Sequence, residues 1–469
     1  MSDGDGPGDD RRSTVAGEGD PPSSPSSTEK AGRIILLVEH AENRRQLERW
    51  VREASSYTAA VVTDPEAPLT GDLCLVDAAA LSRHREWLEE GKSREHPRFY
   101  PVLLAVPESR SDLVGGVTTI GNYFRRAGSY EDSMDGYFEE AEPNYYHDYF
   151  FSLGLLSWEH IEEIPYIVEE LGITSFKWYK NYKDVAPEKF GVDNEMHDDW
   201  ADAFIQALAA QDAPTTLGHH SENMEITSAL GDNPYLDIER DDDEYRGYET
   251  LVEQFPDYAE AQSMTASGSL ARQHDYDDSF YAVHISAGRT ADELAMLHDA
   301  GWDIVGETCT HYLCLTSEEC DERHNVNPPV RSKDDQEILW KRVADGTISC
   351  IGTDHCANMK DDKIGDDVVD SLPGFPSSAT LLPLILSEGV NKGRISLERA
   401  VEVTSTNTAK AFNIYPKKGT VRVGTDADLT VVDLAETKTV TPELLKGGSD
   451  YSPYEGREVT GWPTQTVIR

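Results

Sequence analysis

The stretch 171–184, LGITSFKWYKNYKD, places Lys177 between Phe176 and Trp178, near the end of a segment whose composition predicts a buried strand. An ammonium group is costly to bury unless it is paired or its charge is changed. We therefore expect Lys177 to have a chemical role.

Lys177 belongs to a long succession of alternating strand and helix patterns. The predicted strands are YFFSLGLL (149–156), SFKWY (175–179), TTLGHH (215–220), FYAVHIS (280–286), DIVGET (303–308) and TISCIGT (347–353). Helical patterns such as ADAFIQALAAQ (201–211) and ADELAMLHDAG (291–301) lie between them. So many successive units favour an α/β fold of the (β/α) barrel type over an open sheet. The tail segment 417–434 predicts a strand-turn-strand unit in a small β-module.

Four polar residues lie at or just after the carboxyl ends of these strands: Lys177, His220, His284 and Asp354. Active sites of barrels form on that face, and imidazole and carboxylate groups are good zinc ligands. Each residue alone has another explanation, because strand-end histidines are often structural and Asp354 can cap a helix. Four in order, one per strand, favour a metal site. Successive strand residues face opposite ways, and we predict that His220 rather than His219 points inward.

Several motifs occur in a fixed order along the chain. They are GGVTTIGNYF (115–124), ITSFKWYKNYK (173–183), HHSEN (219–223), VHISAG (283–288), ETCTHYLCLT (307–316), NPPVR (327–331) and GTISCIGTDHCA (346–357). Together they resemble the dihydropyrimidinase, hydantoinase and allantoinase branch of the cyclic amidohydrolases, from about residue 115 to 469. The resemblance implies a barrel at 113–414 and part of a β-sandwich at 415–469.

The resemblance also implies roles for individual residues. Lys177 matches the lysine that reacts with carbon dioxide to give a carbamate bridging two metals, usually zinc. His220 and His284 match ligands of the second metal, and Asp354 matches the ligand that also acts as general base. Tyr182 matches the tyrosine that stabilises the oxyanion of the tetrahedral intermediate.

The resemblance fits the substrate contacts and the first metal less well. Asn327 stands where hydantoinases have a serine, and Gly374 stands near the usual asparagine of the next substrate loop. The His-x-His pair that ends the family's first barrel strand occurs nowhere in this sequence. We therefore expect a barrel without its first strand, with an open seam. The expected outcomes are a weak one-metal enzyme, a non-catalytic remnant, or a barrel completed by another strand or chain.

The amino-terminal quarter has a different character. Residues 1–32 are rich in Gly, Pro, Ser and charge, which predicts a disordered acidic tail. Residues 33–112 resemble a truncated receiver (flavodoxin-like) domain, with Asp77 at the phosphoacceptor position. We expect Asp77 to be only a strand-end acid, because other receiver motif residues are missing. The two incomplete modules meet near Leu113, as expected of a fusion or a rearranged gene.

The chain carries 87 acidic and 42 basic residues, a net charge of −45. Acidic residues spread over the whole chain oppose binding to nucleic acid and to anionic membranes. Such a distribution is typical of proteins that work in concentrated salt. Six cysteines without a CxxC pair, no signal-peptide pattern and no long apolar run predict a cytoplasmic protein with reduced thiols.

These observations lead to one main hypothesis and one alternative. The main hypothesis is a metal-dependent hydrolase, by resemblance a homo-oligomer, that opens a cyclic amide of the dihydropyrimidine or hydantoin type. It would use zinc or another divalent metal, one or two ions per chain, with a carbamylated Lys177. The alternative is a catalytically inactive regulatory or binding protein with a receiver-like module.

Overall fold

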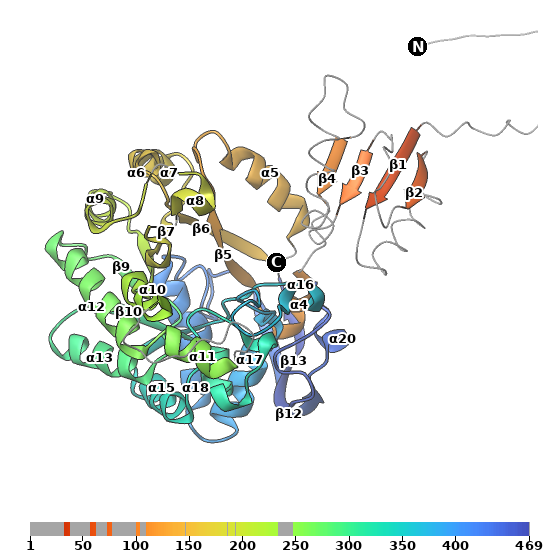
Figure 1. Cartoon of the computed structure of the whole chain (residues 1–469). Coiled ribbons are helices and arrows are strands. Elements are labelled where there is room, and N and C mark those ends of the chain that lie inside the picture. The colour runs from red at the N-terminus through yellow and green to blue at the C-terminus, as the bar shows by residue number, and fades with distance from the viewer. Residues whose placement is uncertain are drawn as a thin grey trace, which may run out of the picture. The chain divides into compact units, whose positions relative to one another are not determined.

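The computed structural model describes four amino-terminal strands by their backbone and residues 109–468 apart from 146, 185, 193 and 233–246. The chain forms two compact units, Met1–Leu104 and Ala105–Arg469 (Figure 1). The predicted boundary at 112/113 falls inside helix α4 (Ser109–Gly115), which belongs to the second unit. Thr466 donates a hydrogen bond to the Leu113 carbonyl, so this helix is tied to the carboxyl-terminal strand.

The first unit contains a parallel four-stranded sheet in the order β2-β1-β3-β4. Its strands are β1 (Gly32–Leu37), β2 (Tyr57–Val61), β3 (Leu73–Val76) and β4 (Tyr100–Leu103). This is also the order of the first four strands of a flavodoxin-like sheet. Asp77 and residues 1–31, the site of the predicted tail, lie outside the described residues. The receiver-like identity of this unit stays a prediction.

The second unit is built on a parallel seven-stranded sheet whose strands follow chain order, β5-β6-β7-β8-β9-β10-β11. The strands are β5 (Thr119–Arg125), β6 (Asp148–Gly154), β7 (Ser175–Tyr179), β8 (Thr216–His220), β9 (Ser279–Ala282), β10 (Ile304–Cys309) and β11 (Ile348–Gly352). Each of the six predicted strand segments overlaps one of these strands, β6 to β11. The α/β fold with a parallel sheet is confirmed.

The sheet does not close on itself within the described residues. A closed barrel pairs its first and last strands, but β5 and β11 are both edges here. Seven strands with two free edges agree with the expected barrel that lacks one strand.

Helices connect the strands and lie along the outside of the sheet (Figure 1). The α-helices of the second unit after α4 are α5 (Met134–Asn144), α6 (Trp158–Glu162), α7 (Ile164–Glu169), α8 (Ala186–Phe190), α9 (Asp198–Ala209), α10 (Met224–Asp232), α11 (Tyr248–Gln254), α12 (Asp257–Gln273), α13 (Gly288–Asp299), α14 (Thr310–Cys314), α15 (Lys333–Asp345), α16 (Lys360–Lys363), α17 (Leu381–Leu384), α18 (Leu397–Val401), α19 (Asn407–Ala411) and α20 (Pro442–Leu445). Short 3-10 turns are η1 (Lys180–Tyr182), η2 (Ser317–Glu319), η3 (Glu322–His324) and η4 (Ser378–Thr380), and π-helical turns are η5 (Ile385–Val390) and η6 (Glu402–Thr406).

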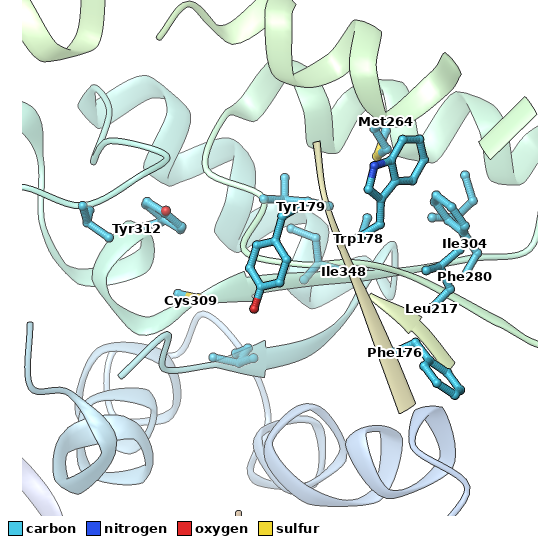
Figure 2. Close-up of a cluster of buried hydrophobic side chains, with 14 of the residues drawn as sticks. Phe176, Trp178, Tyr179, Leu217, Met264, Phe280, Ile304, Cys309, Tyr312 and Ile348 are labelled. Atoms are coloured by element: carbon cyan, nitrogen blue, oxygen red, sulfur yellow. The ribbon is translucent and has the colours of Figure 1, made fainter. Parts of the chain in front are cut away.

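The two faces of β7 explain how a lysine comes to lie among aromatic residues. Phe176 packs edge-on against Phe204 of helix α9, with ring centroids 6.5 Å apart. Figure 2 shows Trp178 beside Met264, while Tyr179 points to the other side of the strand. Because alternate strand residues face opposite ways, Lys177 shares the inner face with Tyr179. The aromatic neighbours of Lys177 in sequence therefore belong to the outer core.

The carboxyl-terminal β-module differs from the prediction. Strand β12 (Leu429–Thr439) pairs antiparallel with β13 (Glu458–Val467) rather than with the segment GTVRV at 419–423. That segment is not a strand, and Val421 and Val423 are exposed. The alternation of apolar and polar residues predicts a strand, but a strand also needs a partner for its backbone groups. The described residues supply none to this segment.

Two further features bear on the sequence predictions. None of the helices described in the structure combines the length and apolar character needed to cross a bilayer. Cys309, Cys314, Cys320, Cys350 and Cys356 are free thiols.

Candidate active site

The carboxyl end of the seven-stranded sheet carries the four predicted site residues. Lys177 lies within β7, His220 ends β8, and His284 and Asp354 follow β9 and β11. The rings of His220 and His284 are 4.4 Å apart. Burial lowers the pKa of Lys177, and the carboxylate of Asp354 is close enough to oppose that shift. The structure therefore gathers these residues at one end of the sheet.

His219 and His220 lie on opposite faces of β8. The ring of His219 packs on Trp178 and Phe280, at centroid distances of 4.7 and 5.6 Å, and its Nδ1 is 3.0 Å from the Ser221 hydroxyl. His219 is therefore part of the outer core, where burial lowers its pKa. His220 faces His284, the orientation expected from strand alternation.

Lys177 is 3 % exposed and has aromatic neighbours. Its Nζ lies 4.1 Å from the ring centroid of Tyr123 and 5.2 Å from that of Tyr179. Desolvation lowers the pKa of Lys177 to about 8, against the opposing effect of Asp354 and Glu307. A neutral amine, the form that reacts with electrophiles, is therefore accessible near neutral pH.

Glu307 is a buried acid in β10 that the sequence reasoning did not select. Its carboxylate accepts hydrogen bonds from the Tyr281 hydroxyl, at 2.6 Å, and from the His284 backbone N–H, at 3.0 Å. Burial raises the pKa of Glu307, and the bond from Tyr281 opposes that shift. A Cβ on Gly352 would lie 2.8 Å from this carboxylate, so glycine leaves room for it. The available sequence signal was a glutamate that opens the motif ETCTH.

Glu222 is a second acid that was missed. Its Oε2 lies 2.6 Å from Nε2 of His220, and both side chains are buried. A metal-binding histidine commonly uses its other ring nitrogen to contact a carboxylate, which fixes the ring orientation. The sequence signal was the glutamate two residues after His220 in HHSEN.

Two of the four site residues have an unusual backbone conformation. His284 has φ of 42° and Asp354 has φ of 44°, in the left-handed region that non-glycine residues rarely adopt. Such strain tends to concentrate at functional sites, where the surrounding structure imposes it. Each lies two residues after the end of a strand, which is Ala282 for His284 and Gly352 for Asp354.

The donor set fits one divalent metal better than two. Nδ1 of His284 is buried and has no hydrogen-bond partner among the described residues, as expected of a nitrogen that binds a metal ion. His220, His284 and Asp354 offer two imidazoles and a carboxylate, which are zinc ligand types, but their ligand atoms do not all lie within 4.8 Å of one another. An ammonium on Lys177 is not a ligand, and the described residues contain no His-x-His pair for a second ion.

The two residues expected at the substrate lie in loops around the same end of the sheet. Tyr182, in η1, stacks on Tyr179 with ring centroids 5.2 Å apart. Burial raises the pKa of Tyr182, and the negative charge of Asp354 adds to this shift. Oδ1 of Asn327 is buried without a hydrogen-bond partner in the described part of the chain. Gly374 has φ of 93°, and its N–H donates to the Asn325 carbonyl at 2.9 Å.

Sequence comparison identifies relatives of this chain. Residues 249–469 match the model of the amidohydrolase family. The D-hydantoinase of Geobacillus stearothermophilus is 30% identical over 369 residues, which cover 76% of this chain and 74% of the relative. The L-hydantoinase of Paenarthrobacter aurescens is 38% identical over 195 residues, covering 40% of this chain and 42% of the relative.

Solved structures that resemble this chain are also hydantoinases and dihydropyrimidinases. The D-hydantoinase from a Bacillus sp. AR9 matches with a TM-score of 0.68 and 26% identity over 77% of this chain and 78% of that one. The dihydropyrimidinase from Brevibacillus agri NCHU1002 matches with a TM-score of 0.68 and 27% identity over 77% of each chain. These matches leave about a quarter of each relative uncovered. They lend no support to the receiver-like resemblance of residues 33–112.

Proposed function

Because this chain belongs to the amidohydrolase family, in its hydantoinase and dihydropyrimidinase branch, we propose that it opens the ring of a small cyclic amide of the hydantoin or dihydropyrimidine type. The observation that carries the proposal is the convergence of Lys177, His220, His284 and Asp354 at the carboxyl end of one parallel sheet. In such folds this end holds the reacting groups.

A divalent metal held by His220, His284 and Asp354 would supply Lewis-acid activation of the attacking water. Asp354 would accept a proton from that water and return it to the amide nitrogen as the ring C–N bond breaks. Tyr182 would donate a hydrogen bond to the carbonyl oxygen as negative charge builds on it. Glu222 would hold His220 in orientation through the 2.6 Å contact.

The proposed role of Lys177 depends on its modification. Carbon dioxide adds to the neutral amine, the nitrogen releases one proton to solvent, and the resulting carbamate is an anionic oxygen ligand. Support comes from the lowered pKa of the lysine, about 8. With no His-x-His pair in the sequence, we propose one metal ion per chain, with Lys177 as its additional ligand when carbamylated.

The test is hydrolysis of dihydrouracil and hydantoin by purified protein with zinc in 2 M KCl. Asp354→Asn should lower the rate at least about a hundredfold, as expected for loss of a general base. Asp299→Asn, an exposed acid at the end of α13, is the matched control and should leave the rate unchanged. Lys177→Ala that is fully active would contradict the assignment of Lys177.

The absence of His-x-His favours a second candidate function, a binding protein that has lost catalysis. Metal content near zero after dialysis, together with no ring opening of either substrate, would support this candidate. Retained zinc with turnover would exclude it.

A further inference from the structure

One histidine near the site is buried without a hydrogen-bond partner among the described residues. His311 lies in α14, directly after strand β10, and is fully buried. Neither of its ring nitrogens has a hydrogen-bond partner among the described residues. A buried polar group without a partner costs free energy, so each such group in a folded protein calls for an explanation.

Two other buried histidines, His160 and His324, have partners for both ring nitrogens within the protein. Nδ1 of His160 accepts a hydrogen bond from the Leu156 N–H at 3.0 Å, and its Nε2 lies 2.9 Å from the Gly128 carbonyl. His324 contacts Asp321 and the Pro453 carbonyl through its two nitrogens. Even His219 in the outer core leaves only Nε2 without a partner among the described residues, whereas His311 leaves both ring nitrogens without one.

His311 lies between the loops that were expected to contact the substrate. Its ring packs edge-on against Phe375, with centroids 5.1 Å apart, and Phe375 follows Gly374. The next residue, Tyr312, donates a hydrogen bond to the Pro328 carbonyl at 2.7 Å, which ties α14 to the loop of Asn327. A positive charge on His311 would also lower the pKa of His284, so His311 lies near the candidate metal ligands.

The chemistry of the ring suits an amide. Burial lowers the pKa of His311 to about 3, so the imidazole is neutral at ordinary pH. A neutral imidazole has one N–H donor and one nitrogen acceptor. A cyclic amide offers the complementary pair, a carbonyl oxygen and a ring N–H.

We propose that His311 is a substrate-binding residue that recognises the N–H and carbonyl groups of the cyclic amide, with Oδ1 of Asn327, in the loop to which α14 is tied, as a further acceptor. The inference rests on the proposed function, since it names a contact within the same site. It explains why three buried polar atoms, two on His311 and one on Asn327, have no partner among the described residues.

The test uses hydantoin and its two N-methyl derivatives. Calorimetry measures the affinity of the protein for each compound, and hydrolysis measures KM. Four proteins are compared in 2 M KCl: wild type, His311→Phe, His311→Gln and the control His160→Phe. Phenylalanine keeps an aromatic ring against Phe375 but removes both polar atoms. Glutamine keeps a donor and an acceptor. Zinc content and melting temperature are recorded for each protein.

We expect His311→Phe to weaken hydantoin binding and raise KM by roughly tenfold to a hundredfold, the effect of losing one or two hydrogen bonds. Wild type should bind hydantoin more tightly than the derivative methylated on the ring nitrogen that His311 contacts. In His311→Phe this difference in affinity should disappear, while zinc content stays unchanged. His311→Gln should restore part of both effects. His160→Phe should leave discrimination unchanged, because its ring lies outside the site, and it should lower the melting temperature because it removes two buried hydrogen bonds.

Three results would overturn the inference. Unchanged binding and discrimination in His311→Phe would show that the residue does not contact the ring. Loss of zinc in His311→Phe would make it a metal ligand instead. Wild-type protein that binds no hydantoin would overturn this contact together with the proposed function. Wild-type protein that binds hydantoin through His311 without hydrolysing it would refute catalysis alone.

Discussion

At the scale of single residues, the contact between Glu222 and His220 makes a direct prediction. Glu222→Gln keeps the side-chain size but removes the charge that orients the imidazole. We expect zinc affinity to fall by about tenfold to a hundredfold, the usual effect of losing such a carboxylate partner. Competition with a chromophoric chelator measures it.

The chain offers a matched control for this substitution. His274, which follows helix α12, and Asp202 of helix α9 form a similar pair at 2.7 Å. Asp202→Asn should leave zinc affinity unchanged. Equal zinc affinity in wild type and Glu222→Gln would show that His220 does not bind the metal.

At this scale, the signal that the sequence offers is strand periodicity, which predicts the face on which a side chain lies. His220 was preferred to His219 because neighbouring strand residues face opposite ways, and the two rings do lie on opposite faces. Glu307 and His311 could not be found this way. They stand out only through their surroundings in the folded chain. Glu307 accepts a hydrogen bond from the Tyr281 hydroxyl of β9, and His311 has no hydrogen-bond partner among the described residues.

At the scale of elements, Lys363 in α16 connects two loops. It is fully buried, and its Nζ donates hydrogen bonds to the carbonyls of Asn325, at 2.7 Å, and Leu372. Desolvation lowers its pKa to about 7. Between about pH 7 and 10 the unfolded chain therefore binds a proton at Lys363 that the folded chain does not, so folding becomes more favourable as pH rises.

Lys363→Met removes this dependence. We expect the difference in free energy of unfolding, wild type minus variant, to increase from pH 7 to 10 by no more than about 1.4 kcal/mol per pH unit. Urea unfolding at each pH measures it. Lys360→Met, on the same short helix, is the control and should show no such slope. A difference that is flat or falls with pH would contradict the buried neutral lysine.

The free edges of the seven-stranded sheet give a second prediction at this scale. Backbone amides of β5 and β11 that point away from the sheet have no strand partner among the described residues. We expect them to exchange hydrogen faster than the amides of β8, which has a strand on each side. Hydrogen exchange followed by mass spectrometry tests this. Equal protection of all three strands would mean that another segment or chain covers the edges.

Elements with many neighbours were the easiest to predict from sequence. Strands β7 and β8 are buried along their whole length, and each of the six predicted runs overlaps a strand of the parallel sheet. The tail shows the limit, because GTVRV has the alternation of a strand but lacks a partner, while β12 pairs with a segment about 30 residues away. Local pattern specifies which residues can form a strand, and distant residues decide whether they do.

At the scale of the whole molecule, the net charge of −45 makes the stability of the folded state depend on salt. Acidic residues are twice as numerous as basic ones and occur throughout the chain, so the folded state repels itself when salt is low. The Debye length falls from about 10 Å at 0.1 M salt to about 3 Å at 1 M, which screens most of this repulsion. The folded state gains more than the unfolded chain, because folding brings the charges closer together.

We therefore expect the melting temperature to rise by several degrees between 0.1 and 2 M KCl, with most of the rise below 1 M, where the Debye length changes most. Thermal unfolding followed by circular dichroism measures it. Sucrose of equal osmolality is the control, since it carries no charge and cannot screen. A rise that continues linearly with KCl, or that sucrose reproduces, would point to exclusion of solute from the surface. An unchanged or lower melting temperature would contradict adaptation to concentrated salt, because a chain with 45 unbalanced negative charges would then have to be stabilised by contacts that do not depend on screening.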